Sequence, residues 1–152
     1  RDLRMSRGLG DVYKRQSIIK TLQDYLTEFD GMEMILTDLT PNAPSSYALA
    51  PAGSGVASKD VLGNVTYQNS YVFLAREHSG DEVDRRDNYD FLEAFCDWLE
   101  ERSRREDFPA LPKPYQVVEI GINNVMLMDI DDNGLGTYQI QIQLIFERRY
   151  DT

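Results

Sequence analysis

The sequence predicts an α+β domain in which two amphipathic helices pack on a mainly antiparallel β-sheet. Three observations favour this class. Apolar residues recur at helical spacing in the segments 17–29 and 88–105, segments rich in β-branched and aromatic residues lie between and after them, and clusters of Gly, Asn, Asp and Pro separate the elements. The length of 152 residues fits one domain, which we place at residues 17–152.

The composition indicates a protein that needs neither disulfides nor a membrane. The only cysteine, Cys96, cannot form an intramolecular disulfide, and the start of the chain has no secretory apolar segment. We therefore expect a chain that is made and kept in a reducing compartment. No apolar run approaches the roughly 18 to 20 residues that cross a bilayer, so we expect no membrane contact.

Residues 1–16 differ from the rest of the chain. They carry five basic and two acidic residues and show no apolar periodicity. The stretch Asp11–Gln16 resembles the translation of a transposase adapter used in DNA library preparation, so we interpret residues 1–16 as an artefact, with a flexible basic tail as the alternative. Without residues 1–16, the chain has 11 basic and 24 acidic residues, so the domain is strongly acidic.

The first predicted elements are a helix and a short strand. The helix begins at Ser17 and carries apolar residues at three- and four-residue spacings, and Asp30-Gly31 ends it near residue 29. A strand follows over 32–39, with Met34 and Leu36 on one face. Residues 41–59 are rich in Pro, Ala, Ser and Gly, so apart from a brief apolar piece over 47–50 we expect a long loop there that is functional or mobile.

The middle of the chain predicts a long strand and the second helix. Residues 60–77 form one strand or a hairpin, with Gly63-Asn64 as a bulge or turn. The polar residues 78–87 form a linker into a helix over 88–105, which Asp87 or Asn88 caps. Within this helix, Phe95 and Trp98 lie on the stripe that we expect to face the sheet.

The C-terminal third predicts three strands, over 116–122, 125–130 and 137–147, joined by turns at Asn123-Asn124 and Asp131–Gly134. The last strand alternates between apolar and polar residues. Its apolar face holds Tyr138, Ile140, Ile142, Leu144 and Phe146.

The residues offer little for catalysis or metal binding. His78 is the only histidine, and Cys96 lies on an apolar helix stripe, where a buried hydrophobe is the expected role. One Cys and one His cannot form a structural zinc set. The run Asp129-x-Asp131-x-Asn133-Gly134 matches half of a calcium loop, but Ile140 stands where the closing glutamate belongs, so a polar β-turn is expected. The sequence predicts no enzyme, no cofactor and no metal.

The negative charge excludes one class of partner. A strongly acidic domain repels phosphate backbones and gains nothing from counterion release, so we expect no specific binding to nucleic acid. Two explanations of the charge stay open. It either lines a passage through which DNA moves without being gripped, or it keeps the protein soluble.

Several segments together resemble one protein family. These are Asp60-Val-Leu-Gly-Asn-Val-Thr-Tyr-Gln68 with Tyr71–Leu74 and Arg76-Glu77; then Arg85-Arg-Asp-Asn88; then Pro109-Ala-Leu-Pro112; and finally Gly136-Thr-Tyr-Gln-Ile-Gln-Ile142. In this order, over residues 17–152, they resemble the tail terminator proteins of tailed phages of Firmicutes, which are also labelled minor capsid proteins.

The resemblance implies a tail-terminator-like fold and a structural role in the virion. It implies a homo-oligomeric ring, a hexamer in the usual case, that closes the head-proximal end of the tail tube and docks a head-completion or neck protein. DNA would pass through the ring without being specifically bound. The protein would be found in the virion, and in the cytoplasm of the bacterial host during assembly. As assembly contacts it suggests Arg76, Glu77, Arg85, Arg86 and Asn88.

Two alternatives differ from this function. A head-completion or neck adaptor protein would share the structural class but form a different ring. A small host enzyme is disfavoured, because the chain lacks a recognisable nucleophile and base.

Overall fold

A computed structural model describes residues 18–38, 40 and 43–148 of the chain. The segment 1–16, predicted to be an artefact, lies outside these residues. The strands are β1 (Ile35–Thr37), β2 (Ser46–Lys59), β3 (Val65–His78), β4 (Tyr115–Ile122), β5 (Met126–Ile130) and β6 (Leu135–Arg148). The long helix is α2 (Glu82–Arg104), and a first helix spans residues 18–26.

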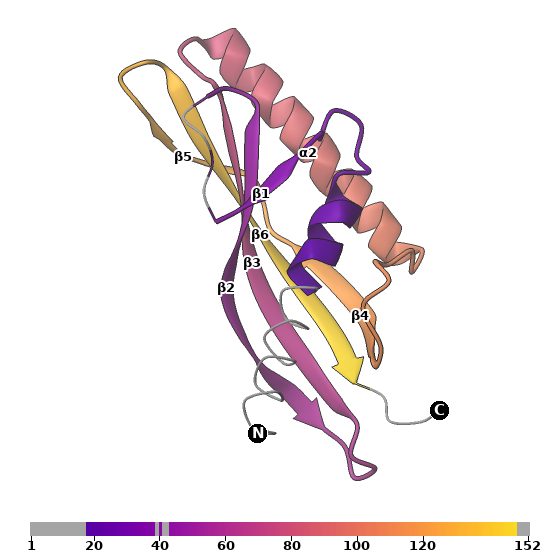
Figure 1. The fold of residues 1–152 in the computed structure, drawn as a ribbon. Coiled ribbons are helices and arrows are strands. Elements are labelled where there is room, and N and C mark those ends of the chain that lie inside the picture. The colour runs from indigo at the N-terminus through magenta and orange to yellow at the C-terminus, as the bar shows by residue number, and fades with distance from the viewer. Residues whose placement is uncertain (1–17, 39, 41–42, 149–152) are drawn as a thin grey trace, which may run out of the picture.

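The strands form one six-stranded sheet with the order β1-β2-β3-β6-β4, and β5 pairs with the same edge of β6 as β4. Only the short β1–β2 pair is parallel among the strand pairs of the described residues. Both helices lie on one face of the sheet (Figure 1). This confirms the predicted α+β class, with two helices on a mainly antiparallel sheet.

The core lies between the helices and the helix-facing side of β3 and β6. The alternation predicted for the last strand is confirmed, because all five of its apolar residues are buried. On the neighbouring strand, Phe73 is fully buried and stacks on Phe95 of α2, with ring centroids 5.0 Å apart. The predicted turn at Asp131 is also present, and its carboxylate accepts the backbone N–H groups of Asn133 and Leu135.

The prediction of a loop over 41–59 was wrong for most of that segment. Residues 46–59 form β2, which pairs along its length with β3, and the two strands make a hairpin. Beyond Ala50 every residue of β2 is exposed, so this half of the strand has no buried face that could produce an alternating pattern. The hairpin turn is held by Asp60, whose carboxylate accepts the backbone N–H groups of Leu62 and Asn64.

The start of the second helix was also predicted wrongly. Residues 82–87, expected in a linker, form the first turns of α2, and Asp81 caps the helix by accepting the N–H of Asp84 at 2.8 Å. Neither Asp87 nor Asn88 is the cap. Glu82, Arg86 and Asp87 in these first turns are exposed, and without apolar periodicity the sequence predicts no helix here.

Two predicted orientations were wrong as well. In the first strand, Ile35 is buried, whereas Met34 is 66% exposed and Leu36 is half-buried, so the inner face is the opposite of the predicted one. In α2, Phe95 faces the sheet as expected, but Trp98 is half-buried and packs on the ring of Tyr25 in the first helix. It lies between the two helices rather than against the sheet.

Candidate functional site

Three of the five residues predicted as assembly contacts meet at the turn between β3 and α2. Arg85 donates to the backbone oxygen of Ser79 at 2.9 Å. The amide of Asn88 donates to the backbone oxygen of His78 at 2.8 Å and to the hydroxyl of Tyr138 at 3.1 Å. These bonds are within the chain and satisfy the backbone of a tight turn, so Arg85 and Asn88 hold the sheet and the helix together.

The other two predicted arginines lie apart from this turn. Arg86 is on the exposed side of α2 and forms a 3.4 Å ion pair with Glu82. Arg76 pairs in register with Thr137 of β6, and by strand alternation it lies on the sheet face away from the helices. The five predicted residues therefore do not form one continuous patch.

Glu77 occupies the most distinctive environment of the five. Its side chain is buried, at 9% exposure, and both carboxylate oxygens accept hydrogen bonds. The hydroxyl of Tyr47 donates to one oxygen at 2.7 Å, and the hydroxyl of Ser45 donates to the other at 3.0 Å. Burial, together with the bonded Glu77 carboxylate and the nearby Glu33, raises the pKa of Tyr47.

A cavity of about 500 Å³ opens beside this carboxylate. It lies among the end of β3, the start of β2, the middle of α2 and the segment that precedes β1. A volume of this size is in the range that accepts a bound molecule or several side chains. Its lining combines carboxylates, hydroxyls and apolar groups, among them Glu33, Met34, Ser45, Tyr47, Glu77 and Phe91.

Sequence reasoning found Glu77 and Asn88 in this cavity but missed Glu33, Ser45 and Tyr47. These residues come from separate segments that meet because β2 pairs with both β1 and β3, which places Tyr47 opposite Ile35 on one side and opposite Ala75 on the other. No spacing pattern in the sequence carries that information.

A second feature is the outer half of β2 together with the hairpin turn, residues 51–64, which we call the arm. Figure 1 shows it extending past the ends of both helices. Its apolar residues Val56, Val61 and Leu62 are 60%, 100% and 82% exposed. An arm with exposed apolar groups at its tip is a candidate contact with another protein.

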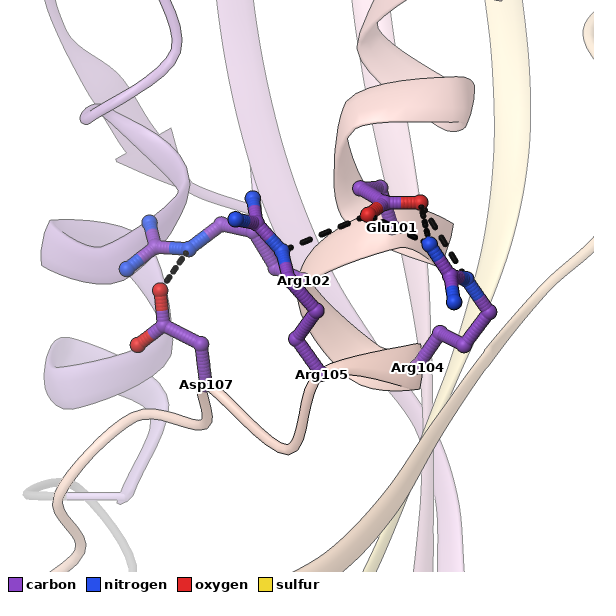
Figure 2. A network of polar contacts seen from close by, with 5 residues as sticks. All are labelled: Glu101, Arg102, Arg104, Arg105 and Asp107. Atoms are coloured by element: carbon purple, nitrogen blue, oxygen red, sulfur yellow. Dashed lines mark hydrogen bonds and ion pairs between the residues drawn. The ribbon is translucent and has the colours of Figure 1, made fainter.

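The C-terminal end of α2 carries a network of ion pairs (Figure 2). Arg102 joins the two helices, because its guanidinium pairs with Glu28 at 2.8 Å and with Asp107 at 2.9 Å. It also lies over the ring of Tyr25, 4.3 Å from its centroid. Arg104 pairs with Glu101 on the helix surface at 2.6 Å. These arginines, like Arg85, have partners within their own chain.

Few side chains among the described residues have the chemistry that catalysis needs. Burial raises the pKa of the Cys96 thiol to about 12, which makes it a poor nucleophile. Across residues 18–38, 40 and 43–148, no group of three or more His, Cys, Asp or Glu residues is placed to hold a metal ion. No helix of that part has the length and hydropathy of a membrane-spanning segment.

Comparison with known proteins finds similarity only at the level of the fold. Neither a protein-family model nor a curated protein matches the chain. A solved structure that does match is a chain of the virion of a native gene transfer agent (GTA) particle, with a TM-score of 0.52 and 10% sequence identity. The match covers 87% of this chain and 92% of the other. At this identity, the two chains share a fold.

Proposed function

We propose that this protein is a structural subunit of a phage-like virion, and that within the virion it is the tail terminator. The observation that carries the proposal is the fold match to a virion chain, because the match covers nearly the whole of both chains. A shared fold alone does not give function. The motifs from Asp60 to Ile142 that resemble tail terminators are an independent line of support, since they come from the sequence and not from the fold.

The specific role is a homo-oligomeric ring, with six subunits as the expected number, that closes the head-proximal end of the tail tube and docks a neck protein. An exposed arm is suited to contacts in such a ring, and a closed ring needs a heterologous interface between copies. The acidic domain is suited to let DNA pass without binding it.

The experiment is to assemble the full chain with the tail tube protein encoded beside it in the source genome. Light scattering should show a ring mass, and electron microscopy should show tubes closed at one end by a ring. Rings that bind the neck protein but leave tubes open would replace the terminator role with that of a neck adaptor. A chain that stays monomeric in the presence of the tube protein would refute the ring.

A further inference from the structure

The cavity beside Glu77 holds two carboxylates whose charge is not balanced within the described chain. Glu77 accepts hydrogen bonds only from the neutral hydroxyls of Tyr47 and Ser45, and Glu33 lines the same cavity. Neither forms an ion pair with a described residue. Of the two, Glu77 is buried and Glu33 is exposed. A buried carboxylate is costly unless it is paired, so the cavity favours a cationic group from outside beside Glu77.

The arm carries a lysine, Lys59, that has no ion-pair partner among the described residues. Lys59 is exposed and forms no ion pair or side-chain hydrogen bond with a described residue. It stands just before the turn whose tip holds Val61 and Leu62. The cavity has a matching apolar wall, because Met34 and Phe91 line it beside the carboxylates. The arm also holds the carboxylate of Asp60, but that group accepts the backbone N–H groups of Leu62 and Asn64 in the turn. The ammonium group of Lys59 and two apolar groups are therefore the parts of the tip that fit a site with negative charge and apolar surface.

The arm cannot reach the cavity of its own chain. Val65 and His78 mark the two ends of β3, with the arm at the first end and Glu77 at the second. At roughly 3.3 Å per residue, these ends lie roughly 40 Å apart. Figure 1 shows the hairpin tip at one end of the molecule and the start of α2 at the other. A contact between the arm and the cavity therefore requires a second copy.

We propose that the arm of one copy docks into the cavity of the next, with Lys59 facing Glu33 and Glu77 and the Val61-Leu62 tip against Met34 and Phe91. The inference rests on the proposed ring and specifies which surfaces form it. The two surfaces lie at opposite ends of one subunit, so the contact is head-to-tail, and it forms the proposed ring when the rotation between successive copies closes.

The pairing is stronger than a surface ion pair for a physical reason. Glu77 is already largely removed from water in the single chain, so the incoming ammonium group pays little further desolvation of that carboxylate. In the low-dielectric surroundings of the cavity, the attraction between opposite charges exceeds that between exposed side chains. Burial of the exposed Val61 and Leu62 adds a hydrophobic contribution to association.

The first test is chemical cross-linking of the full chain in its assembled state. A carbodiimide joins a carboxylate to a lysine amine as an amide bond only where the two groups touch. Mixing chains labelled with light and heavy nitrogen separates bonds between copies from bonds within one. Mass spectrometry should find Lys59 joined to Glu33 or Glu77 between light and heavy chains. Assemblies that yield cross-links only at other lysines would overturn the inference.

The second test uses charge variants of the full chain. Lys59→Glu should raise the concentration needed for half-assembly by about tenfold or more, since it places like charges together. Lys113→Glu is the matched control, because Lys113 is also exposed and without an ion pair to a described residue, and it should leave assembly unchanged. Adding Glu33→Lys to Lys59→Glu should restore assembly. The charge reversal is made at Glu33 because a lysine at position 77 would also lose the hydrogen bonds that Glu77 accepts from Tyr47 and Ser45.

The outcomes separate this inference from the function it rests on. If rings form and close tubes but Lys59→Glu assembles like the parent chain, the arm and cavity contact is wrong and the terminator role stands. If the parent chain forms no ring with the tube protein, the proposed ring itself fails and the arm contact fails with it.

Discussion

The contact between the two helices depends on Trp98, and its removal tests how the helices are held. The indole lies among three aromatic rings, with centroid distances of 5.9 Å to Tyr25, 5.4 Å to Phe29 and 5.9 Å to Phe95. The guanidinium of Arg102 covers it at 5.0 Å. Trp98→Ala removes all four contacts at once and leaves the main sheet interface of α2 in place.

The expected loss follows from these contacts. Each aromatic pair contributes about 0.5 to 1.5 kcal/mol beyond area burial, and the cation–π contact about 0.5 to 1 kcal/mol. Because Trp98 is half-buried, we expect Trp98→Ala to lower the free energy of unfolding by about 2 to 4 kcal/mol. Phe95 is fully buried, and Phe95→Ala should cost more, about 3 to 5 kcal/mol.

Urea denaturation followed by far-ultraviolet circular dichroism measures both variants, since the only tryptophan is lost in one of them. Val83→Ala, at a position 60% exposed, is the control that should leave the midpoint unchanged. A loss below about 1 kcal/mol for Trp98→Ala would refute the described helix pairing, as would a loss larger than that of Phe95→Ala.

Three further outcomes follow from the described contacts. Arg102→Ala should lower the urea midpoint measurably, whereas Arg104→Ala should not, although the Arg104 ion pair is shorter, because that pair is exposed. The thiol of Cys96 should resist a thiol reagent at pH 8 until denaturant is added, because its pKa is about 12 in the folded chain. Burial raises the pKa of the Tyr25 hydroxyl to about 12, and Arg102 partly opposes this shift. The unfolded state therefore loses this proton at lower pH than the folded state, and the free energy of unfolding should fall between pH 10 and 12. Tyr25→Phe should flatten that fall in denaturation midpoints measured against pH.

The elements that the sequence predicted correctly are those with one buried face. In β6, every second residue from Tyr138 to Phe146 is buried, and this burial is what an alternating pattern records. The outer half of β2 has no buried face and is held by its backbone pairing with β3. Backbone pairing without a buried face leaves no periodic signal in the side chains, so residues 51–59 show no strand pattern in the sequence.

The candidate site was predictable only where its residues are close in the sequence. Glu77, Arg85 and Asn88 are predicted from two neighbouring motifs that resemble tail terminators, and the structure places all three at the turn between β3 and α2. The hydrogen-bond partners of Glu77, which are Tyr47 and Ser45, are about thirty residues away and arrive through strand pairing. Arg85 and Asn88 already donate hydrogen bonds to acceptors within the chain, and their role as assembly contacts stays a prediction.

The exposed edge of β2 explains why side chains rather than strand pairing would carry a contact between subunits. β1 covers β2 only from Tyr47 to Leu49, so in the described part the rest of β2 is an edge strand. Register shifts interrupt this edge after Pro51 and after Val56, and a proline has no N–H to donate. Interruptions of this kind prevent a neighbouring sheet from extending an edge. The small residues of β2 need only the backbone of β3 to stay extended, which leaves Lys59 and the apolar tip as the groups of the arm that can select a partner.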